Sequence, residues 1–155
     1  MPTNLTTTLP KIYIAAEHCG VNLKQFLLGN TKLELIDIYP INNPEDDYPD
    51  VAKILAQKLL DNPNDFGIVI CGSGQGIAMS ANRFSHIRCA IPLSVEAMVK
   101  TREHNNTNVI SFSASIEQQL ALKIVETMVI SPKSEVLRHT RRVAKMCDIN
   151  FTNLS

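Results

Sequence analysis

Short apolar runs and stretches with helical spacing alternate along this chain from end to end. The apolar runs predict five strands, at residues 11–16, 33–38, 66–71, 88–91 and 108–112. The spacing of apolar positions between and after these runs predicts helices at residues 22–28, 49–60, 77–84, 94–102, 116–129 and 134–147. The runs are apolar at nearly every position, as in strands that are buried on both faces. This alternation predicts an α/β fold, a parallel sheet with helices on both sides.

The length of the chain fits a single domain with a proper core, since it has 155 residues. We expect a three-layer α/β/α sandwich with a five-stranded, Rossmann-like parallel sheet over residues 11–148. Residues 1–10 are polar and lack the apolar segment of a secretory signal, so we interpret them as a loose tail. Residues 149–155 form a second, short tail.

The composition excludes several classes of partner. Hydrophobic residues make up 45% of the chain and charged residues 19%, and the formal net charge is zero. A neutral chain has no overall field that would gather nucleic acid or an anionic membrane. No apolar run approaches the ~20 residues that span a bilayer. We therefore expect no nucleic-acid partner and no membrane partner.

The four cysteines are scattered along the chain and show no paired spacing of a zinc or disulfide motif. This pattern favours a reduced, cytoplasmic protein without a structural metal. Cys19, Cys89 and Cys147 have no evident partners, and we interpret each as a core or incidental residue. Cys71 differs because of its neighbours.

Residues 68–76 read Ile-Val-Ile-Cys-Gly-Ser-Gly-Gln-Gly, an apolar strand that delivers Cys71 to a glycine turn at the start of a helix. The first N–H groups of a helix lack internal partners and lie at the positive end of its dipole, so they attract anions. The same field favours the thiolate form of a neighbouring cysteine. A base beside an anion cradle is typical of chemistry on a substrate that becomes negatively charged. The alternative interpretation is that the glycines serve only tight packing and that the cysteine is inert. The glycine spacing matches neither the dinucleotide-binding pattern nor the P-loop pattern.

Other polar residues follow predicted strands and helices. Glu17 and His18 come directly after the first strand, and the carboxyl ends of parallel strands meet at one edge, where sites of such folds lie. We expect them on the same edge as Cys71. A polar run begins at His104, which could act as an acid or base near neutral pH. Arg138 and Arg142 share one helix face and together match a phosphate group, although a solvated basic stretch is the alternative.

Together these motifs resemble the type B ribose-5-phosphate isomerase family, which includes galactose-6-phosphate isomerase subunits. The resemblance covers nearly everything after residue 10. It rests on Ala-Glu-His-Cys-Gly (16–20), Asp-Tyr-Pro (47–49), Ile-Cys-Gly-Ser-Gly-Gln-Gly-Ile (70–77), Ala-Asn-Arg-Phe (81–84), Ile-Arg-Cys-Ala (87–90), Arg-Glu-His-Asn-Asn-Thr-Asn-Val (102–109) and Arg-His-x-x-Arg-Val (138–143).

The resemblance implies a cofactor-free and metal-free aldose–ketose isomerisation of a sugar phosphate through an enediolate, in the pentose phosphate pathway. Cys71 would move the proton between C1 and C2, with Ser73 beside it. His104 would assist ring opening together with Glu17. The implied substrate-binding residues are His18, Tyr48, Gly72, Gly74, Gln75, Gly76, Asn105, Arg138, His139 and Arg142. The family also implies a homodimer or a dimer of dimers whose sites draw on both subunits.

Two positions depart from the family pattern. Glu17 stands where the family usually has aspartate, and Ser115 stands where it commonly has an arginine that adds to the phosphate site. Two alternative functions remain open: an isomerase of a six-carbon aldose phosphate, and a non-catalytic sugar-phosphate sensor. The presence of Cys71, Ser73 and His104 argues against the sensor.

Overall fold

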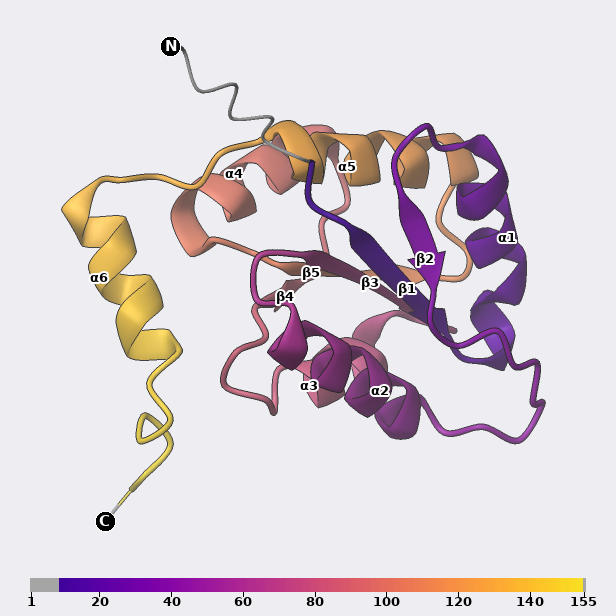
Figure 1. The fold of residues 1–155 in the computed structure, drawn as a ribbon, viewed down its shortest axis with the longest axis horizontal. Helices are drawn as coiled ribbons and strands as arrows, with labels where there is room; N and C mark the ends of the chain where they lie inside the picture. Colours follow the sequence, from indigo (N-terminus) through magenta and orange to yellow (C-terminus); the bar gives the residue numbers. More distant parts are fainter. Residues whose placement is uncertain (1–8, 155) are drawn as a thin grey trace, which may run out of the picture.

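Five parallel strands form the centre of the molecule, in the order β2-β1-β3-β5-β4 (Figure 1). The structure is a computed structural model that describes residues 9–154. The strands are β1 (Ile12–Ala16), β2 (Leu35–Asp37), β3 (Phe66–Cys71), β4 (Cys89–Ala90) and β5 (Val109–Ser113). This sheet confirms the predicted five-stranded parallel architecture.

Helices cover both faces of the sheet and confirm the three layers. They are α1 (Val21–Asn30), α2 (Tyr48–Asp61), α3 (Gln75–Ala81), α4 (Val95–Asn105), α5 (Gln118–Ile130) and α6 (Leu137–Met146), with a short 3-10 turn η1 (His18–Gly20) before α1. Helices α1, α4 and α5 lie on one face, and α2 and α3 lie on the other (Figure 1). Helix α6 stands at one end of the molecule, where it packs against α4 (Figure 1).

The core lies in two layers because alternate strand residues point to opposite faces. In β1, Ile12 and Ile14 belong to the layer under α1 and α5, whereas Tyr13 and Ala15 belong to the layer under α2. All residues of β1 and β3 are buried. Burial on both faces is the reason that these strands read as continuous apolar runs.

Every predicted helix and strand is present, and the structure differs from the prediction mainly at the ends of these elements. Strand β4 is shorter than predicted because it pairs with β5 alone, at only two positions. Helix α6 begins at Leu137 rather than at Ser134. The backbone N–H of Ser134 donates to the carbonyl of Glu103 on α4 at 3.1 Å, so this segment runs along α4 instead of starting a helix.

The predicted N-terminal tail, 1–10, falls largely outside the described residues. Residues 149–152 form turns after α6. Across residues 9–154, no helix combines the length and the apolar character needed to cross a bilayer.

Candidate active site

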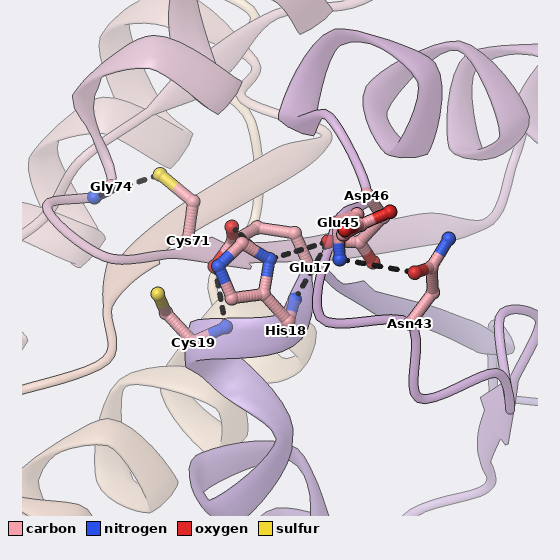
Figure 2. Close-up of polar contacts among 8 residues, drawn as sticks. All are labelled: Glu17, His18, Cys19, Asn43, Glu45, Asp46, Cys71 and Gly74. Carbon is pink, nitrogen blue, oxygen red and sulfur yellow. Dashed lines mark hydrogen bonds and ion pairs between the residues drawn. The ribbon is translucent and has the colours of Figure 1, made fainter.

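The carboxyl ends of the three central strands meet at one edge of the sheet. Ala16 pairs with Ile70, and Cys71 pairs with Ser113. The polar residues that follow β1 and β3 therefore lie together, as the sequence predicted. Figure 2 shows Cys71 and Gly74 together on one side of Glu17 and His18.

The Cys71 thiol faces the glycine turn. The backbone N–H of Gly74 donates to Cys71 Sγ at 3.2 Å, and Cys71 is only 4% exposed (Figure 2). The next amide, that of Gln75, donates to Ser73 Oγ at 3.2 Å. Helix α3 begins directly after Gly74. The turn thus holds amide donors beside a thiol at the carboxyl edge of the sheet.

The turn is fixed by its contact with β5. Gly74 has φ +75°, and a Cβ at this position would lie 2.8 Å from backbone atoms of Phe112 and Ser113. The Ser113 hydroxyl donates to the carbonyl of Gly72 at 2.8 Å and lies 2.8 Å from Ser115 Oγ. The Ser115 hydroxyl therefore adds to the contacts that hold the turn against β5.

Tyr48 closes the other side of the turn. It is the first residue of α2, and its ring packs against Gly76. A Cβ at position 76 would lie 2.6 Å from Tyr48 Cζ, so the tyrosine ring requires glycine there. Tyr48 remains 43% exposed, which leaves part of its ring available beside the turn.

Glu17 and His18 lie directly after β1. Glu17 is 5% exposed and caps η1, because its Oε1 accepts the backbone N–H of Cys19 at 2.7 Å. His18 Nδ1 lies 3.1 Å from Glu17 Oε2 and 2.7 Å from Asp46 Oδ1 (Figure 2). The hydrogen bond to Asp46, together with the charge of Glu17, raises the pKa of His18 above its ordinary value.

Asp46 is a site residue that sequence reasoning missed. It lies in the loop before α2 and accepts both the backbone N–H and Nδ1 of His18, at 3.0 and 2.7 Å. Burial opposes its ionisation, but the hydrogen bonds from His18 outweigh burial and lower the pKa of Asp46. Its other oxygen, Oδ2, is buried without a partner among the described residues. Only its place directly before the Asp-Tyr-Pro motif could have signalled a role.

Cys19 is exposed and is therefore not a core residue. Its Sγ lies 3.9 Å from the position of a Cβ built on Gly72, so the thiol stands beside the turn that follows Cys71. The hydrogen bond with the Glu17 carboxylate, together with its negative charge, raises the pKa of Cys19. One potential metal ligand atom from each of Glu17, His18 and Cys19 lies within 4.8 Å of the others.

The remaining predicted site residues lie at the opposite edge of the sheet. His104 and Asn105 end α4, just before β5 begins at Val109, which pairs with Gly67 at the start of β3. Cys71 lies at the far end of the same pairing, about 13 Å further along the strands at ~3.3 Å per residue. Within one chain, the structure does not bring His104 to Cys71.

Two residues of this second group, His104 and His139, line a separate pocket. The rings of His104 and His139 lie 4.5 Å apart between centroids, and both line a pocket of about 230 Å³ between α4 and α6. His139 is 6% exposed, and its Nδ1 is buried without a partner among the described residues. Burial, followed by the nearby positive charges, lowers the pKa of His139. Arg138 and Arg142 are exposed on α6.

Comparison with known proteins identifies relatives that cover most of this chain. The family model described as Ribose/Galactose Isomerase matches residues 12–146. A probable ribose-5-phosphate isomerase B of Mycoplasma pneumoniae is 38% identical over 140 residues, covering 87% of this chain and 91% of the relative. Ribose-5-phosphate isomerase B of Mycobacterium tuberculosis is 33% identical over 148 residues, covering 92% of this chain and 91% of the relative.

Solved structures show the same fold. Ribose-5-phosphate isomerase B of Mycoplasma genitalium with bound ribulose-5-phosphate has a TM-score of 0.81 and 32% identity, covering 92% of this chain and 97% of that one. The ribose 5-phosphate isomerase of Thermotoga maritima has a TM-score of 0.81 and 36% identity, covering 92% of this chain and 100% of that one.

Proposed function

The chain belongs to the ribose/galactose isomerase family, among its type B ribose-5-phosphate isomerases, and on that premise we propose that it interconverts ribose 5-phosphate and ribulose 5-phosphate. The observation that carries the proposal is the Cys71 thiol, held against the Gly74 amide at the edge that also bears Glu17 and His18. The relative solved with ribulose-5-phosphate supports the choice of substrate.

In this proposal Cys71 is the base that moves a proton between C1 and C2. Removing a proton beside a carbonyl generates an oxyanion, which needs donors that are already in place. The amides of residues 72–76 supply them, with the Ser73 hydroxyl beside the thiol. A single oxyanion donor can lower the activation barrier by about 3 kcal/mol. The Gly74 and Gln75 amides already face Cys71 and Ser73, so the donors and the base share one turn.

Ring opening and phosphate binding draw on the second group of residues. His104 would assist ring opening with Glu17, and Asn105 would bind the sugar. Arg138, Arg142 and His18 would hold the phosphate. Because the two groups lie at opposite edges of one sheet, we propose that the site forms between two copies, with the Cys71 group of one protomer facing the His104 group of its partner. A homodimer, alone or paired into a tetramer, satisfies this requirement.

The direct test supplies ribose 5-phosphate to the enzyme without added metal and follows ribulose 5-phosphate. Cys71→Ala should lower kcat at least ~100-fold, the usual contribution of a general base. Cys147→Ala, which removes a thiol outside the site, should leave the rate unchanged. A folded Cys71→Ala protein that turns over at the normal rate would contradict the assigned base.

The shared site has its own test, which uses two inactive variants. Cys71→Ala and His104→Ala should each be inactive alone. When they are co-expressed, activity should return to about a quarter of wild type, because half of randomly paired dimers are mixed and each mixed dimer holds one intact site. No recovery in a mixture shown to contain mixed dimers would mean that both groups serve within one chain.

A six-carbon aldose phosphate is a second candidate substrate. The family description includes galactose isomerases, and Ser115 removes the arginine expected at the phosphate site. Because one extra carbon changes binding only modestly, affinity alone would not separate the candidates. A panel of pentose and hexose phosphates should therefore be compared by kcat/KM. The cytoplasmic location and the pentose phosphate pathway stay predictions.

A further inference from the structure

Three consecutive residues hold three different donor atoms close together beside Cys71. A carboxylate oxygen of Glu17, an imidazole nitrogen of His18 and the sulfur of Cys19 all lie within 4.8 Å of one another. The η1 turn creates this grouping, because Glu17 Oε1 accepts the Cys19 N–H at 2.7 Å and draws the two ends of the segment together.

The chemistry of the donors selects the ion. Oxygen, imidazole nitrogen and thiolate sulfur together suit Zn²⁺, whereas Mg²⁺ and Ca²⁺ prefer oxygen alone. Tetrahedral zinc bonds of about 2.0–2.3 Å place donor atoms ~3.5 Å apart. Side-chain movements of about 1 Å would therefore bring these three donors into contact with one ion.

Asp46 prepares His18 for such a role. Its Oδ1 lies 2.7 Å from His18 Nδ1 and so leaves Nε2 as the ring nitrogen available to a ligand (Figure 2). A carboxylate behind a metal-binding histidine is the usual arrangement at zinc sites, where it fixes the tautomer and orients the ring. The Asp46 side chain is 5% exposed, so the carboxylate that contacts His18 is shielded from solvent.

The cluster adjoins the proposed base. Cys19 Sγ lies 3.9 Å from the position of a Cβ on Gly72, the residue after Cys71. Figure 2 shows the Cys19 and Cys71 sulfurs on the same side of the His18 ring. An ion bound here would occupy Glu17 and His18, both of which the proposed function assigns to the substrate, and would stand beside the Cys71 sulfur.

We propose that Glu17, His18 and Cys19 form an inhibitory site for a thiophilic divalent cation such as Zn²⁺, positioned by Asp46. The inhibitory role rests on the proposed function, because the ion would displace the sugar phosphate from its site. The metal site itself stands on the geometry of the cluster alone.

The test adds Zn²⁺ alone to the full-length, reduced protein in a non-chelating buffer and measures binding by calorimetry and isomerase activity in parallel. The wild type should bind one ion per chain and lose activity. Cys19→Ala should keep the metal-free rate but bind at least tenfold more weakly and resist inhibition by a similar factor. Cys147→Ala, the matched control, should behave as the wild type.

Co²⁺ substitution gives a readout that does not depend on activity. A thiolate-to-cobalt absorption band should appear in the wild type and be absent from Cys19→Ala. Equal Zn²⁺ affinity in the wild type and Cys19→Ala would overturn the site, and binding without inhibition would overturn the inhibitory role. An inactive wild type that still binds through Cys19 would refute the isomerase proposal and leave the metal site standing.

Discussion

Gly74 holds a backbone conformation that other residues rarely adopt, at the point where the site is built. Its φ of +75° lies in the left-handed region, and backbone atoms of β5 stand where a Cβ would be. The backbone conformation of the turn and its contact with the sheet therefore each require glycine at position 74. The close approach of this turn to β5 is what presents the amide to Cys71.

Gly74→Ala should destabilise the fold by at least 1–2 kcal/mol, because a left-handed conformation costs about that much for an L-residue and the Cβ contact adds to it. Denaturant unfolding measures the effect. Gly29→Ala is the matched control and should not destabilise the protein. A Cβ there meets nothing within 4 Å, and alanine is the better helix former by up to ~1 kcal/mol. Equal stabilities of Gly74→Ala and wild type would show that the turn relaxes freely.

His139 provides a prediction on pH. Its pKa is lowered in the folded state, chiefly by burial, so between the folded and unfolded pKa values the unfolded state binds more protons. Stability should therefore be full above the unfolded value of about 6.5 and decline as pH falls toward the lower, folded value. Unfolding at a series of pH values should show this decline, and His139→Gln should reduce it. An NMR titration that places His139 above its ordinary pKa would contradict the prediction.

At the scale of elements, the loop between β2 and α2 is held by a buried lysine. Lys24 of α1 is 2% exposed, and its Nζ lies 3.0 Å from Asp37 Oδ2 and donates to the carbonyl of Tyr39 at 2.8 Å. These contacts fix the start of the loop whose later residue, Asp46, binds His18. Helix α1 thus supports the loop that carries Asp46 through a residue, Lys24, that is not itself part of the site.

Lys24→Met should destabilise the protein by about 3 kcal/mol, because it leaves the Asp37 carboxylate without its partner. Chemical denaturation gives the value. The double variant Lys24→Met/Asp37→Asn should recover part of the loss, since it removes the unpaired charge. Lys32→Met, at an exposed position of the same region, should change stability by less than ~0.5 kcal/mol. Similar losses at Lys24 and Lys32 would show that the pair contributes little.

At the scale of the whole molecule, α6 stands apart from the edge that holds Cys71. It packs against α4 and carries Arg138 and Arg142 on its exposed surface (Figure 1). Both arginines are exposed in a single chain and form no ion pair among the described residues, so their proposed role in phosphate binding has to be tested by kinetics.

Arg138→Gln and Arg142→Gln should each raise KM for the sugar phosphate about tenfold, the effect of losing one charge-assisted hydrogen bond of ~1.5 kcal/mol or more. Stability should stay unchanged because both side chains are exposed. Lys100→Gln, an exposed cation of α4 outside the predicted site, is the control for general charge effects. Steady-state kinetics at fixed ionic strength would contradict the assignment if all three variants matched the wild type.

The sequence by itself determined the order of elements and the location of the thiol. Both are local properties: alternating runs identify strands and helices, and a glycine turn after a strand places Cys71 at its carboxyl end. The shared edge of Glu17, His18 and Cys71 followed as well, because parallel strands all end on the same side.

Only the tertiary structure decided which distant side chains meet. Asp46 reaches His18 across 28 positions of sequence, and Cys19 stands beside the turn rather than in the core. The distance between His104 and Cys71 within one chain likewise depends on the register in which β5 pairs with β3. Periodicity reports which face of an element is buried, whereas contacts between loops depend on how the packed layers bring their ends together.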